Sequence, residues 1–158
     1  MLRIFGTTEK WDDIAYLKGA LNRKEAEPVR SLILEARALT PGVSDNEVLL
    51  LPGDPNLESW FARPRPELSS PVIFVDQYYD RFVEEDFKRL LTNPPRLIII
   101  GPDPFWRYFF YHWSSNYGTE RLINQVSKSL LPEKYTLAKE LKMDLEYGPE
   151  SFQIFVRK

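Results

Sequence analysis

Three short runs of almost uninterrupted apolar residues restrict the fold of this chain more than any other feature of its sequence. They span residues 47–51, 71–75 and 96–100, and each contains four residues of the Val, Ile, Leu and Phe types. A strand with one face in water alternates apolar and polar residues, whereas a strand that is apolar on both faces belongs inside a parallel sheet covered by helices. The three runs therefore predict a central, mainly parallel sheet.

The segments between these runs have the pattern of amphipathic helices. Apolar residues recur three and four positions apart over residues 29–39, 83–91 and 122–130, which predicts three helices with one apolar face each. Pro28 suits the first turn of the first helix, and Pro41 with Gly42 ends it. On the polar side of the second helix, two glutamates precede Lys88 and Arg89 by four positions, a spacing that favours ion pairs.

The two ends of the chain have different patterns. Residues 135–141 and 151–156 have the composition of two strands that flank Gly148 and Pro149, which predicts an antiparallel pair at the C-terminal end. Residues 1–26 show no clear periodicity, and we expect an irregular N-terminal arm there. A chain of 158 residues suits a single domain. The predicted fold is therefore one α/β domain over residues 1–158, a three-layer sandwich with a central mainly parallel sheet and an antiparallel C-terminal strand pair.

Composition argues against several classes of function. The formal net charge of −2 argues against the strongly basic surface that is typical of a nucleic-acid-binding protein. The absence of cysteine removes disulfides, thiol chemistry and cysteine-based zinc sites. His112 is the only histidine and no serine-elbow motif is present, so neither a histidine metal site nor a serine hydrolase is supported. The longest aliphatic runs have the length of a strand, whereas a helix that crosses a membrane needs about 20 apolar residues. We therefore expect no segment of this chain to cross a bilayer.

An aspartate follows each predicted parallel strand: Asp54, Asp76 and Asp103. Ligands of α/β sheets bind at the carboxyl ends of the strands, where three carboxylates could hold a magnesium ion. However, Asp54 and Asp103 each precede a proline, which is the pattern of a helix N-cap followed by the first helical residue. We favour the interpretation that these aspartates cap helices. The alternative is that the chain is a stand-alone enzyme that uses magnesium and these aspartates for phosphoryl chemistry.

The segment 105–113 is unusually aromatic, since seven of its nine residues are Phe, Trp or Tyr. Trp106 and Trp113 lie at its two ends, and Arg107 lies within it. Such side chains are favoured at membrane interfaces and protein contacts, where one end is apolar and the other wet. A helix that is aromatic on all sides can equally be buried in the core. The segment therefore leaves a contact surface, a protein-interaction module and simple core packing as open alternatives.

Four stretches together carry a resemblance to a known family. Residues 40–52 follow an amphipathic helix with a Thr-Pro-Gly turn and a strand, and residues 54–66 contain a short helix and a basic proline-rich turn. Residues 90–100 run from a helix through paired prolines into a hydrophobic strand, and residues 152–157 form a closing strand. This order resembles the soluble C-terminal domain of the polytopic lipid-donor glycosyltransferases, which include protein mannosyltransferases and lipid A aminoarabinose transferases.

The resemblance implies a larger protein whose membrane helices carry the acidic catalytic residues and use a polyprenyl-phosphate sugar as donor. None of the family's catalytic positions falls in this chain, so we expect neither a catalytic residue nor a metal or cofactor here. The expected role is an accessory domain on the extracytoplasmic, periplasmic face of the cell membrane, which caps the membrane-embedded part of the same polypeptide. Trp106 and Trp113 would then face lipid headgroups or membrane helices, and Trp60, Arg63 and Arg65 would bind a sugar or phosphate.

Overall fold

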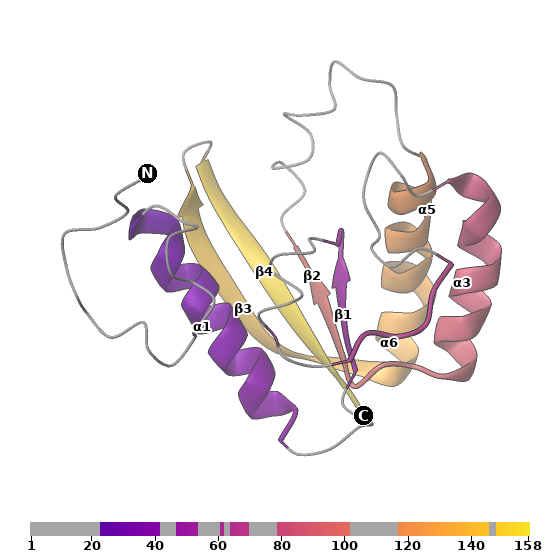
Figure 1. Ribbon diagram of the computed structural model, residues 1–158, viewed down its shortest axis with the longest axis horizontal. Coiled ribbons are helices and arrows are strands. Elements are labelled where there is room, and N and C mark those ends of the chain that lie inside the picture. The colour runs from indigo at the N-terminus through magenta and orange to yellow at the C-terminus, as the bar shows by residue number, and fades with distance from the viewer. Residues whose placement is uncertain are drawn as a thin grey trace.

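The computed structural model of the chain describes residues 23–41, 47–53, 61, 64–69, 79–101, 117–145 and 148–158. The helical elements in these ranges are α1 (Arg23–Leu39), α3 (Asp80–Thr92), α5 (Tyr117–Gln125), the π-helical η2 (Val126–Leu130) and α6 (Leu131–Lys134). The strands are β1 (Val48–Leu51), β2 (Leu97–Ile100), β3 (Tyr135–Leu145) and β4 (Gly148–Arg157). The chain is an α/β protein, as expected, with helices beside a twisted sheet (Figure 1).

The four described strands form one mixed sheet in the order β1-β2-β4-β3. β1 and β2 are parallel, with Val48 opposite Leu97. β4 is antiparallel to both of its neighbours, β2 and β3. The predicted antiparallel pair at the C-terminal end is therefore confirmed, and β4 joins it to the parallel pair. Both strands are longer than predicted, and Gly148 and Pro149 belong to β4 rather than to the connection between the strands. The predicted third parallel strand, residues 71–75, lies outside the described residues, so the described sheet has one parallel and two antiparallel pairs.

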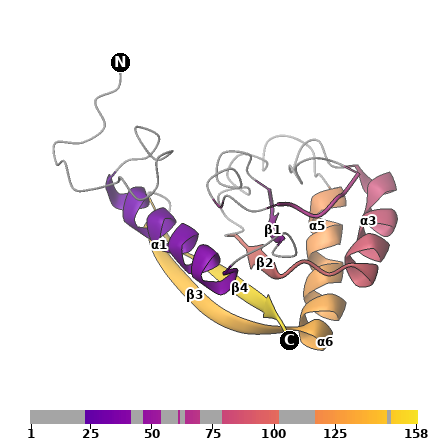
Figure 2. The same cartoon turned by 60° about the horizontal axis from the view of Figure 1, so that its bottom comes forward.

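Both faces of the central strands are buried, as their aliphatic runs predict. Leu50, Leu97 and Ile99 face the cluster that contains the apolar side of α1. Leu49 and Ile98 face the opposite cluster, which contains the apolar sides of α3, α5 and η2. Figures 1 and 2 show α1 along β3 and β4, whereas α3 and α5 lie together near β1 and β2. Because the helices on the two faces cover different parts of the sheet, the described chain is not a clear three-layer sandwich.

The first helix begins earlier than the sequence pattern indicates. α1 starts at Arg23, so the predicted irregular arm over residues 1–26 is wrong for its last four residues, and residues 1–22 lie outside the described ranges. The expectation that Pro28 lies in the first turn is also wrong, because Pro28 is the sixth residue of α1. Arg, Lys, Glu and Ala have high helix propensity, which favours a helix in residues 23–27 before the proline. Propensity alone can therefore add a turn where no apolar periodicity is visible.

The last long helix widens into a π turn just before a proline. At η2 the N–H of Leu131 donates to the carbonyl of Val126, five residues earlier. In a regular α-helix the ring of Pro132 would clash with the carbonyl of Lys128, and proline supplies no N–H. The wider turn accommodates Pro132 while Val126 stays buried. Across the described ranges, none of the helices combines the length and the apolarity that crossing a bilayer requires.

Candidate ligand-binding groove

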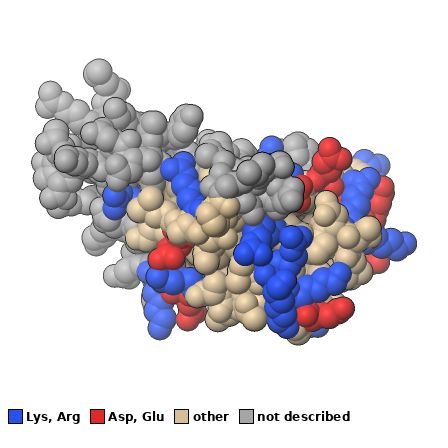
Figure 3. Space-filling view, turned by 90° about the horizontal axis from the view of Figure 1, so that it is seen from below, with Lys and Arg blue, Asp and Glu red and all other residues tan. Residues whose placement is uncertain are grey.

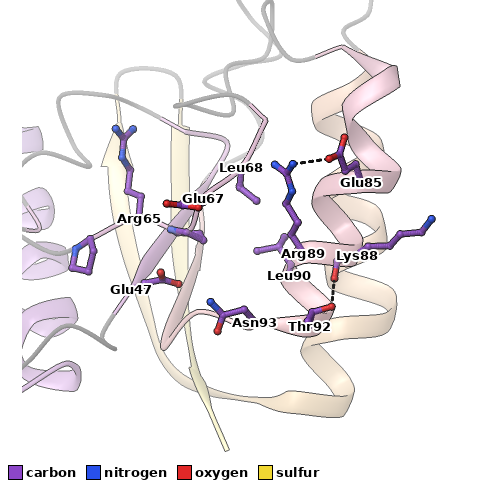
Figure 4. A pocket seen from close by; sticks show the side chains of 12 residues that line it. Glu47, Arg65, Glu67, Leu68, Glu85, Lys88, Arg89, Leu90, Thr92 and Asn93 are labelled. Carbon is purple, nitrogen blue, oxygen red and sulfur yellow. Dashed lines mark hydrogen bonds and ion pairs between the residues drawn. The ribbon is translucent and has the colours of Figure 1, made fainter.

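A groove of about 1220 Å³ lies between residues 64–68 and the C-terminal half of α3. Figure 4 shows the side chains around it, with Glu47 beside the start of β1 and Asn93 at the end of α3. The walls therefore come from a loop segment, a helix and the start of a strand. This groove is the candidate ligand-binding site that the described residues offer.

The loop wall is fixed at both of its ends. At the first end, the carbonyl of Pro64 accepts a hydrogen bond of 3.0 Å from the backbone N–H of Val48. At the second end, the backbone N–H and the hydroxyl of Ser69 both donate to Oδ1 of Asp86, at 2.8 and 2.7 Å. The segment is thus attached to β1 on one side and to α3 on the other.

The carboxylate of Asp86 on α3 connects the helix wall of the groove to the loop wall. Its side chain is 0% exposed, and Nη1 of Arg89 approaches Oδ1 to 3.3 Å. A buried carboxylate requires such donors, because taking an unpaired charge out of water is costly. Asp86 was not anticipated from the sequence. The available signal was its position, three residues after the buried Val83 and four before the buried Leu90, which places it on the apolar face of α3.

Charged groups of both signs surround the groove. Arg89 forms an ion pair of 2.6 Å with Glu85, as the spacing of four predicts, and its stem lies near Leu68 (Figure 4). Glu84 instead accepts hydrogen bonds from Gln125 and Arg121 of α5. Lys88 points outward from α3 (Figure 4). The groove therefore contains acidic, basic and amide side chains, and its charge is not of one sign only.

The lining has the chemistry of a hydrogen-bonding site with a small apolar floor. Glu47, Glu67, Arg65 and Asn93 supply acceptors and donors, and the buried Leu90 adds apolar surface to the lining. Within the described ranges, no group of three His, Cys, Asp or Glu side chains is placed to hold a metal ion. Sites that combine a few polar groups with an apolar surface suit small organic ligands, including sugars.

Of the site residues expected from the sequence, Arg65 alone lies in the described ranges, and it is part of the groove wall. The other seven lie outside the described residues: Asp54, Trp60, Arg63, Asp76, Asp103, Trp106 and Trp113. Their expected roles stay predictions. The groove residues on α3 and at the start of β1 were not expected, because only the tertiary fold brings them to residues 64–68.

A buried tyrosine holds the turn between α3 and β2, which lies beside the groove. Tyr135 is 3% exposed, and its hydroxyl donates to the carbonyl of Pro95 at 2.6 Å. Burial raises the pKa of the Tyr135 phenol, and the nearby Arg157 opposes that rise only in part. The hydroxyl therefore stays protonated as a donor, which fixes the turn between α3 and β2 beside the groove.

Comparison with known proteins adds no relative to this description. No protein-family model, no curated protein and no solved structure matches the chain. A functional assignment therefore starts from the residues of the groove and from the arrangement of the strands.

Proposed function

We propose that this chain is an extracytoplasmic accessory domain of a membrane-embedded, lipid-donor glycosyltransferase, and that its groove contributes to acceptor or glycan binding. The supporting observation is the position of the stretches that resemble this family. Residues 40–52, 90–100 and 152–157 include β1, β2 and most of β4, which are adjacent strands of one sheet. Stretches that are far apart in the sequence thus form one structural unit, as expected for parts of a single family domain.

The groove lies beside this unit and contains Arg65, one of the two arginines of the remaining stretch, residues 54–66. Arg65 belongs to the Pro-Arg-Pro turn of residues 64–66, and the turn forms the loop wall. A sugar ring presents hydroxyl groups around its edge and an apolar face above and below. Guanidinium, carboxylate and amide groups over the Leu68 and Leu90 side chains match both surfaces.

The proposed role is non-catalytic, with the sugar transfer carried out in the membrane-embedded part of the same polypeptide. The domain would cap that part on the periplasmic side and position an acceptor or glycan. In the same proposal, the complete domain is a three-layer sandwich with a central mainly parallel sheet, of which β1 and β2 are the described parallel pair.

Mass spectrometry of separated membrane and soluble fractions from the source cells tests the parent protein. We expect peptides of residues 117–158 to occur in a large membrane protein together with peptides from hydrophobic spans. Recovery of these peptides solely from a soluble 18.6 kDa species would contradict the proposal.

The groove is tested separately with soluble probes. Oligosaccharides and a short-chain polyprenyl phosphate would be titrated into the chain while amide chemical shifts are followed by NMR. We expect saturable shifts near Ser69 and Asn93, and about a tenfold rise in Kd for Arg65→Ala, since a charged hydrogen bond is worth about 1.5 kcal/mol. Lys142→Ala removes an exposed cation on β3 as a matched control. Shifts that avoid the groove, or equal effects of the two variants, would contradict glycan binding there.

A further inference from the structure

Four cationic side chains gather at the end of the molecule where β4 finishes. We call this set the basic pole and define it as Arg96, Lys134, Arg157 and Lys158. Figure 3 shows Lys and Arg side chains gathered near the middle of the face seen from below, which is the end where Figure 1 places the C-terminus. They come from the beginning of β2, the end of α6 and the end of β4, so the fold assembles this set from distant segments.

The cationic groups of the basic pole contact backbone carbonyls. Nζ of Lys134 donates to the carbonyl of Leu91 at 2.7 Å, near the end of α3. Nζ of Lys158 donates to the carbonyls of Pro132 and Glu133 at 3.1 and 3.2 Å. The two arginines make similar contacts, Arg157 Nη1 to Pro94 O at 2.5 Å and Arg96 Nη1 to Arg157 O at 3.5 Å.

These carbonyl contacts do not neutralise the positive charge of the basic pole. A carbonyl carries only a partial charge, and lysine has three donors and arginine five, so these bonds do not use all the donors. Lys158 is exposed, and the other three residues of the pole are half-buried. In the part of the chain that the structure describes, none of the four side chains forms an ion pair with a carboxylate. Elsewhere, by contrast, Lys139 lies 2.6 Å from Glu35. Glu47, Glu133 and the terminal carboxylate of Lys158 in the 158-residue chain are acidic groups near the pole that offset part of its charge.

The geometry points to a contact between the basic pole and anionic lipid headgroups. The chain as a whole carries a net charge of −2 although these four residues are cationic, so the other residues together are net negative and a phosphate surface attracts the basic pole more than the rest of the chain. Each cation near an anionic membrane favours binding by about fivefold, equivalent to about 1 kcal/mol. Four cations together strengthen binding by at most about a thousandfold, because the nearby acidic groups reduce the gain, and this limit corresponds to a Kd of about 1 mM in accessible lipid.

Such a contact is weak for a free chain but sufficient to orient a domain that is tethered close to a membrane. The turn between α3 and β2 connects the basic pole to the groove, since Thr92 and Asn93 line the groove and Lys134 holds the carbonyl of Leu91. With the basic pole on the headgroups, this end of the groove lies next to the membrane surface. That last step rests on the proposed function, whereas the lipid contact itself does not.

Vesicle co-sedimentation of the full 158-residue chain tests the inference. The vesicles contain phosphatidylcholine alone, or phosphatidylcholine and phosphatidylglycerol in equal parts. We expect binding to the anionic vesicles only, with a loss on addition of salt because screening shortens the range of the attraction. Lys134→Gln with Lys158→Gln should weaken binding by about 30-fold, and Lys134→Arg with Lys158→Arg should retain it.

The matched control removes the same charge from another surface. Lys139→Gln with Lys142→Gln on β3 should change binding by less than about threefold. If the basic-pole double variant loses its native circular dichroism spectrum, Lys158→Gln alone replaces it, with an expected loss of about fivefold. Equal losses in the basic-pole and control variants, or no binding to anionic vesicles, would overturn the inference. Full competition by free glycerol phosphate would also overturn it and would indicate a small-anion site.

The two proposals fail independently. Loss of vesicle binding alongside saturable oligosaccharide shifts in the groove would reject the lipid contact and leave the proposed function standing. Vesicle binding alongside recovery of the chain only as a soluble species would reject the transferase assignment and retain the lipid contact.

Discussion

Replacing the buried carboxylate that joins the two walls of the groove is the most direct test of how the groove is held together. In Asp86→Ala, the backbone N–H and the hydroxyl of Ser69 lose the acceptor that they share. Arg89 loses the contact of 3.3 Å to the same oxygen and keeps its ion pair with the exposed Glu85. The substitution therefore leaves donors at a part-buried position without this acceptor and removes the shortest hydrogen bonds between Ser69 and α3, whereas the bond of 3.4 Å from Arg89 Nη1 to Ser69 Oγ remains.

The expected cost follows from these contacts. A hydrogen bond to a charged group contributes about 1.5 to 3 kcal/mol, and Asp86 accepts two at short distance from Ser69. The third contact, to Arg89, is longer and half in solvent, so we assign it a small share. We therefore expect Asp86→Ala to lower the free energy of unfolding by about 3 to 5 kcal/mol. Asp86→Asn keeps one acceptor oxygen and should cost about half as much.

Urea denaturation followed by far-ultraviolet circular dichroism measures this difference, and the amide exchange rate of Ser69 reports on the loop itself. The matched control is Glu85→Gln, one residue earlier on the same helix, whose side chain is 61% exposed. That change should cost about 0.5 kcal/mol or less. A loss of under about 1 kcal/mol in Asp86→Ala, with an unchanged exchange rate at Ser69, would refute the reasoning.

Three further predictions concern the core and its response to pH. Because burial raises the pKa of Tyr135, the unfolded chain releases this proton first, so the free energy of unfolding should fall as pH rises above about 10; urea titrations across that range should show a smaller fall in Tyr135→Phe. Ile98→Ala, at a side chain that is 0% exposed, should cost about 2 to 5 kcal/mol in urea unfolding, whereas Leu137→Ala, at a side chain that is 53% exposed, should cost about 0.5 kcal/mol or less. In Gly101→Ala the added Cβ would lie 3.2 Å from the Phe152 ring, so the ring must move by a few tenths of an ångström and the melting temperature should fall by a few degrees, as expected for about 1 kcal/mol of overpacking.

Local patterns in the sequence determined the element types and much of the core. The aliphatic runs before Gly101 and Pro52 became the buried strands β2 and β1, and the stripe at spacing three and four became α3. These features depend on residues that are close in the chain, because helix and strand periodicity place neighbouring side chains on a common face. The same reasoning gave the antiparallel pair of β3 and β4, which are joined by a short connection.

Partner choice between distant segments was decided only by the tertiary structure. The insertion of β4 between β2 and β3 depends on pairing Leu97 with Val156, and no periodicity in either segment specifies that partner. The sequence singled out Arg65 of the groove but not Asp86, because a carboxylate in a helix is normally interpreted as facing water. Asp86 is buried because Ser69, 17 residues earlier, supplies its donors. A buried charge becomes acceptable only when its partners are in place, and the complete fold brings them there.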